Sequence, residues 1–142
     1  MIIELSSDGA LQSPDLHDGC FYGIVAENGK LVKLLVRDHH EKPYEIVLGN
    51  VGSMNVTCFW GGDIILDVSL LPIGKAPPHM LKALFQDRIT EEDKIAEAVA
   101  KNPRQYLFAL ESSYGADIYA TCDKMQIRSD TNKEDATEVN DS

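Results

Sequence analysis

Apolar and polar residues alternate along most of the first half of this chain, which is the pattern of half-buried β-strands. Two such runs, Cys20–Ala26 and Leu31–Arg37, flank the dipeptide Asn28–Gly29. Asn-Gly supplies the positive φ angles of a two-residue type I′ turn, so the two runs are expected to form a β-hairpin. The predicted register builds one apolar face from three cross-strand pairs: Phe21 with Val36, Gly23 with Leu34, and Val25 with Val32.

A second pair of alternating runs, Met54–Trp60 and Ile64–Leu70, surrounds a Gly-Gly-Asp segment at 61–63. A three-residue loop places Cys58 opposite Leu66 and keeps the polar residues of both runs on the other face. The pattern therefore predicts a second hairpin.

The rest of the body shows more strand patterns and two helical ones. Strands are expected at Met1–Leu5, Tyr44–Leu48, Tyr106–Glu111 and Asp117–Ile127, and helices at His79–Gln86 and from Thr90 to Lys101. We therefore expect an α+β fold with a largely antiparallel sheet of about seven or eight strands, built from consecutive hairpins. Two helices are inserted before the last strands.

Inward-facing apolar positions define the expected core: Phe21, Val25, Val32, Leu34, Val36, Ile46, Val56, Cys58, Leu66, Val68, Leu84, Phe108 and Ile118. If Leu66 is buried there, its truncation to alanine should cost about 2–5 kcal/mol. The three cysteines are widely spaced and lie in strand-like runs, which favours reduced, buried thiols.

The chain has 142 residues, 44% of them hydrophobic, and a formal net charge of −10. These values predict a single α+β domain over residues 1–128, large enough to bury a core without disulfides or metal. Residues 129–142 carry five acids against one lysine, and we expect a disordered acidic tail there. No basic stripe exists to bind nucleic acid. No membrane span or signal peptide pattern occurs, so we expect a cytoplasmic protein without a membrane partner.

Histidines occur in two short segments that could carry metal chemistry. His17 and Asp18 precede a strand, and His39 and His40 lie in the connection between two strands. If the two loops converge, these four residues could hold zinc or iron, and a small metal-binding enzyme is one alternative for this chain. The structural interpretation treats the two histidine segments as polar loops, with Asp15 or Asp18 closing an Asx-turn, and we favour it. We therefore expect no cofactor.

No nucleophile, phosphate-loop or dinucleotide motif occurs in the sequence, which favours a non-enzymatic role. Acidic and aromatic residues at predicted turns and on polar strand faces remain as candidates for function. An acidic surface suits a basic protein partner, and tyrosine is enriched at interfaces. The candidate partner-binding residues are Asp63, Asp67, Glu111, Tyr114 and Asp117.

Three segments together, Asp15–Gly19, Trp60–Asp67 and Glu111–Ala116, resemble small bacterial β-rich proteins that include immunity proteins of polymorphic toxin systems. The resemblance implies a cytoplasmic protein that binds and blocks a cognate toxin, and it carries over no catalytic residue. We therefore expect a non-catalytic binding protein whose partner is a basic toxin domain. The alternatives are the metal-binding enzyme and an uncharacterised structural domain that forms a homodimer through a sheet edge.

Overall fold

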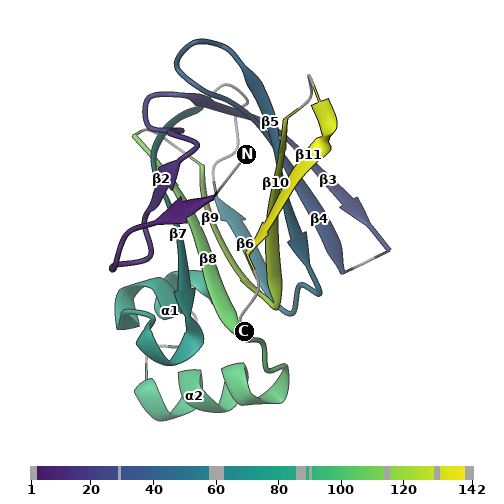
Figure 1. Cartoon of the computed structure of the whole chain (residues 1–142). Coiled ribbons are helices and arrows are strands. Elements are labelled where there is room, and N and C mark those ends of the chain that lie inside the picture. Colours follow the sequence, from purple (N-terminus) through teal and green to yellow (C-terminus); the bar gives the residue numbers. More distant parts are fainter. Residues whose placement is uncertain are drawn as a thin grey trace.

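The computed structural model describes residues 3–28, 30–57, 63–85, 89, 91–113, 116–129 and 132–139, with the backbone alone for Asp63 and Asn132–Val139. These residues form eleven β-strands, one short 3-10 helix and two α-helices (Figure 1). The strands are β1 (Glu4–Leu5), β2 (Leu11–Ser13), β3 (Cys20–Glu27), β4 (Leu31–Arg37), β5 (Pro43–Gly49), β6 (Met54–Thr57), β7 (Asp63–Pro72), β8 (Tyr106–Ser112), β9 (Asp117–Cys122), β10 (Lys124–Ser129) and β11 (Asn132–Val139). The helices are η1 (Ile73–Lys75), α1 (Pro78–Leu84) and α2 (Glu92–Lys101). The predicted α+β class is confirmed, with antiparallel pairing and both α-helices inserted between β7 and β8.

The main sheet has nine strands in the order β11-β10-β5-β4-β3-β7-β8-β9-β6, and β1 and β2 form a separate pair. β3 and β7 share two residue pairs, Cys20 with Ile64 and Phe21 with Asp63. This short seam divides the sheet into two layers, from β11 to β3 and from β7 to β6. The main core lies between the layers and takes residues from both of them, among others Phe21, Leu34, Ile46, Val68, Phe108 and Ile118.

The chain bends from one layer into the other between β9 and β10. β9 ends at Cys122 and β10 begins at Lys124, so the bend lies at Asp123. β9 pairs with β6, whereas β10 pairs with β5. We expected one continuous strand over Asp117–Ile127. The bend instead places its two halves in different layers, as strands do where they switch sheets at a corner.

The hairpin between β3 and β4 is confirmed, with Phe21 opposite Val36, but Glu27 lies opposite Leu31, so three residues separate the strands and the expected two-residue connection is wrong. The register shifts just after Phe21, so Val25 lies opposite Lys33 and not opposite Val32. An irregularity of this kind adds one residue to a strand and changes the face of every later side chain. Val25, which we expected in the core, is consequently 40% exposed.

The second predicted hairpin is wrong. β6 pairs with β9, where Met54 lies opposite Ala120 and Val56 opposite Ile118. β7 pairs with β8 and, at its start, with β3. β8 and β9 therefore separate the two strands that we expected to be neighbours. The apolar face of β6 packs equally well against any apolar strand, so its alternation does not select β7 as the partner; Cys58 lies outside the described residues.

Most of the predicted core is buried: Phe21, Val32, Leu34, Val36, Ile46, Val68, Leu84, Phe108 and Ile118. The prediction that Leu66 lies in the core is wrong, because this side chain is 50% exposed while its neighbour Ile65 is fully buried. The register of β7 against β8 shifts between Ile65 and Asp67, so Leu66 is an extra residue outside the regular ladder. Val56 is partly buried against the same core.

The strand number exceeds the expected seven or eight for three reasons. The predicted strand over Asp117–Ile127 is divided in two, β2 pairs with β1, and Asn132–Val139 forms β11. We expected residues 129–142 to lack regular structure, but the backbone of β11 lies antiparallel to β10, with Met125 opposite Val139. The outer edge of β10 offers unpaired backbone donors and acceptors to a following segment, which polar side chains do not prevent.

The two α-helices lie at one end of the molecule (Figure 1). α1 packs Met80 and Leu84 against β8 and β9 on the face of the layer that points away from the core. The Asn55 side-chain amide of β6 donates a hydrogen bond of 2.8 Å to the Ala83 carbonyl, so one of the last carbonyls of the helix has a partner. In α2, Ile95 is the buried residue. No helix among the described residues has the length and apolar character needed to cross a lipid bilayer.

Candidate functional site

Three of the predicted partner-binding acids lie on three neighbouring strands. Asp67 on β7 is directly opposite Glu111 on β8, and Asp117 is the first residue of β9, which pairs with β8. Each acid is next in sequence to a core residue and so points away from the core; those core neighbours are Val68, Leu110 and Ile118. The two other predicted residues are not placed with them, because the side chain of Asp63 and all of Tyr114 lie outside the described residues.

Hydrogen bonds fix the position of two of these acids. The Tyr119 hydroxyl donates to Glu111 Oε2 at 2.9 Å, and Asp117 Oδ1 accepts a bond of 3.0 Å from the Ser112 N–H. Burial of the phenol, followed by its bond to Glu111, raises the pKa of Tyr119 well above the usual range, so this hydroxyl remains a donor. Within the described part of the chain, the Asp67 carboxylate takes part in no hydrogen bond or ion pair.

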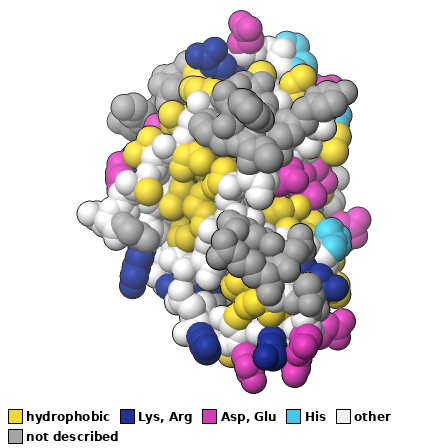
Figure 2. Space-filling model, turned by 180° about the vertical axis from the view of Figure 1, so that it is seen from behind, with side chains coloured by type: hydrophobic (Ala, Val, Ile, Leu, Met, Phe, Trp, Pro, Cys, Tyr) yellow, Lys and Arg dark blue, Asp and Glu magenta, His cyan; other side chains and the backbone are white. Residues whose placement is uncertain are grey.

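Two large apolar side chains lie exposed on the same strand as Asp67. Ile64 is 45% exposed and Leu66 is 50% exposed. Because of the register shift, Leu66 and Asp67 both face outward although they are adjacent in sequence. Figure 2 shows a face of the molecule on which hydrophobic side chains gather with acidic side chains next to them. Five outward-facing residues of β7, β8 and β9 make up what we call the acidic–apolar surface: Ile64, Leu66, Asp67, Glu111 and Asp117.

Sequence reasoning missed the apolar half of this surface. The run Ile64–Leu66 is continuously apolar, and such a run reads as a buried strand or as one side of a hairpin. The acids were found because charged residues within a strand must be solvated. Nothing in the amino-acid pattern of this run indicates the register shift that turns Leu66 outward.

His17 holds the loop before β3 against β7. Its Nδ1 lies 2.7 Å from the backbone oxygen of Leu66, and its Nε2 lies 3.6 Å from Asp18 Oδ1. The bond to Leu66 and then the charge of Asp18 raise the pKa of His17 above its usual value. The backbone N–H of Asp18 also donates to the Ile65 carbonyl at 2.9 Å. These contacts give the His17–Asp18 pair a structural role at the irregular part of β7.

The four residues of the alternative metal site do not assemble into one. Cys20 lies opposite Arg37, which brings the loop of His17 and the turn of His39 and His40 to the same end of the β3–β4 hairpin. The two histidine rings of that turn contact each other, with centroids 3.9 Å apart. Among the described residues, which include all four candidates, no group of three or more His, Cys, Asp or Glu side chains could hold a metal ion.

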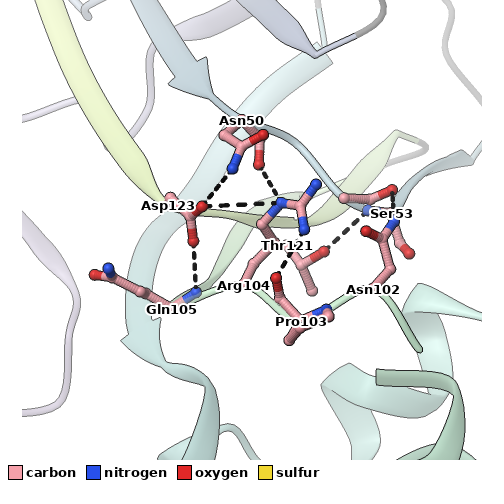
Figure 3. Close-up of polar contacts among 9 residues, drawn as sticks. Asn50, Ser53, Asn102, Pro103, Arg104, Gln105, Thr121 and Asp123 are labelled. Carbon is pink, nitrogen blue, oxygen red and sulfur yellow. Dashed lines mark hydrogen bonds and ion pairs between the residues drawn. The ribbon is translucent and has the colours of Figure 1, made fainter. Parts of the chain in front are cut away.

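A polar network stabilises the corner between the layers (Figure 3). Arg104 Nε donates to the Asn50 carbonyl at 2.6 Å, and the Asn50 side-chain amide donates to Asp123 Oδ2 at 2.5 Å. The Ser53 N–H donates to Thr121 Oγ1 at 2.9 Å. These polar groups bond to one another within the fold, so the network fixes the bend.

Comparisons with protein-family models, with curated proteins and with solved structures found no match for this chain. The resemblance to immunity proteins therefore stays a prediction.

Proposed function

We propose that this chain is a non-catalytic binding protein that uses the acidic–apolar surface to bind a basic protein. An immunity protein that neutralises a cognate toxin in the cytoplasm is the form that we favour. The observation that carries the proposal is the exposure of Ile64 and Leu66 beside Asp67 on one strand.

The apolar pair supplies the energy of binding in this proposal. A leucine side chain that passes from water into an interface gains about 1.5–3 kcal/mol when fully buried, so half-exposed Leu66 can still gain about 1 kcal/mol. Ile64 contributes a similar amount, and both side chains project from a paired strand whose backbone is already ordered. A partner therefore loses little free energy in ordering this surface.

The acids raise the association rate and the selectivity for basic partners. Asp67 and Glu111 are directly opposite each other, and like charges in that position repel. A lysine or arginine of a partner placed between them removes the repulsion and forms charge-assisted hydrogen bonds. Such a surface steers a basic partner toward itself and makes association sensitive to salt.

The two alternatives make different demands on the protein. A metal-dependent enzyme needs a ligand set that holds its metal, and the described histidines and acids supply no such set. A homodimer needs no second protein, so sedimentation of the purified chain over a range of concentrations distinguishes it from the proposed binder.

The test uses the protein encoded by the gene adjacent to the one for this chain. Leu66→Ala should weaken binding of that protein about tenfold or more through faster dissociation, and Asp67→Lys should slow association at low salt. Matched controls are Val25→Ala, which trims another exposed apolar side chain, and Glu97→Lys on the exposed side of α2. Equal losses in the test and control variants would refute the surface, and an adjacent product without toxicity would refute the immunity role.

A further inference from the structure

An apolar groove of about 430 Å³ lies along α2, on elements that take no part in the acidic–apolar surface. Its walls come from η1, α1 and one face of α2, and they include Ile73, Leu81, Ile95, Ala96, Val99 and Ala100. The α2 residues recur at three- and four-residue spacing, so they form a stripe along one side of the helix. The groove therefore follows the helix axis for about 12 Å, the rise of eight residues.

Small residues keep the groove open. Ala96 and Ala100 of α2 are exposed although they belong to the apolar stripe. Gly74 lies in the opposite wall, and a Cβ atom added there would meet no other atom within 4 Å. The protein itself leaves this space unfilled, and the groove is open to solvent at Ala96 and Ala100.

The size of the groove fits a small molecule. Ligand sites of proteins occupy about 300–1,000 Å³ and are lined mainly by apolar side chains with a few polar groups. A partner helix is about 10 Å wide, so three of its turns would displace on the order of 1,200 Å³, and only a row of its side chains would enter. A ligand with an apolar body of about ten carbons can lie in the groove as a whole.

The charged residues that line the groove determine which ligand charge it favours. Its charged lining residues are Glu92 and Arg104. Figure 3 shows the Arg104 guanidinium directed to the corner network, where it donates to the Asn50 and Pro103 carbonyls and its charge is offset by Asp123, whose Oδ2 lies 4.0 Å from Arg104 Nε. Glu92 takes part in no ion pair among the described residues and has acidic neighbours on both sides. These carboxylates outweigh the partial positive charge of the helix N-terminus, which is about half an elementary charge.

We propose that the groove between α1, η1 and α2 binds a small cationic amphiphile, a primary amine with an apolar chain whose ammonium group pairs with Glu92. The chain of the ligand lies along Ile95, Ala96 and Val99 toward the far end of the helix. This proposal does not depend on the proposed function, because it concerns different elements and a different class of ligand.

Titration of the full-length protein with decylamine, decanol and decanoate at pH 7, low salt and concentrations below micelle formation tests the proposal. Methyl resonances of Val99 and Ala96 report binding at the groove. Decylamine should bind about three- to tenfold more tightly than decanoate, with decanol between them, because a partly exposed charge pair contributes modestly and a like charge costs a similar amount.

Two pairs of variants distinguish the effect of charge on ligand binding from the effect of groove shape. Glu92→Gln should reduce the preference for decylamine over decanoate, whereas Glu97→Gln, the same change at an exposed position of α2 outside the lining, should leave the preference intact. Gly74→Phe should fill the groove and abolish binding of all three ligands, while Gly74→Ala should not. The proposal is overturned by equal binding of amine and carboxylate to the native chain, by binding that survives Gly74→Phe, or by the absence of shifts at Val99.

Discussion

Two adjacent residues of β7 provide a sharp test of the register shift. Ile65 is fully buried and Leu66 is 50% exposed. Ile65→Ala removes buried methyl and methylene groups and leaves a cavity, so it should cost about 2–5 kcal/mol. Leu66→Ala removes at most half of the roughly 1.5–3 kcal/mol that full burial of a leucine contributes, and water fills the space. Its cost should be about 1 kcal/mol or less.

Urea unfolding of the native chain and both variants, followed by circular dichroism, measures this difference. With a slope of about 2 kcal/mol per molar, Ile65→Ala should lower the midpoint by about 1–2.5 M and Leu66→Ala by about 0.5 M or less. Equal slopes in the three proteins are the control for two-state behaviour. Equal losses, or a larger loss for Leu66→Ala, would show that the outward placement of Leu66 is wrong.

Three further outcomes are expected. Burial raises the pKa of the Cys122 thiol to about 12, so mass spectrometry should find Cys122 unlabelled by iodoacetamide at pH 8 in the folded chain and labelled after unfolding. The pKa of His17 is raised, so its contribution to stability is fully present below about pH 6.5 and is lost as pH rises through its folded pKa; Asp18→Asn should lower its NMR titration midpoint. Thr121→Val leaves the Ser53 N–H without its partner and should cost about 1–3 kcal/mol in urea unfolding.

The sequence predicts local structure better than strand partners. The pairing of β3 with β4 is predictable because the two strands are adjacent in the chain, but the register that a two-residue turn requires is wrong next to the turn, where Glu27 lies opposite Leu31. No comparable restriction acts on β6. Its alternation shows that one face is buried, but β9 lies about sixty residues further along the chain and satisfies that face as well as β7 would.

The same distinction explains which parts of the candidate site were predictable. Asp67, Glu111 and Asp117 are charged residues in strands, and the period of two places them on the solvent side without knowledge of their neighbours. The outward turn of Leu66 depends on a one-residue irregularity in pairing with β8, which alternation does not encode.

The irregularity in β7 is held by specific contacts. Its extra residue, Leu66, is exposed and so forgoes about 1 kcal/mol of burial compared with a regular strand. The His17 ring bonds the freed Leu66 carbonyl and the Asp18 N–H bonds the carbonyl of Ile65, so the loop before β3 satisfies backbone groups that a regular partner strand would otherwise take. Removal of these contacts should return Leu66 toward the core. His17→Ala is therefore expected to weaken binding of a partner at the acidic–apolar surface although it leaves every side chain of that surface unchanged, whereas His39→Ala is not.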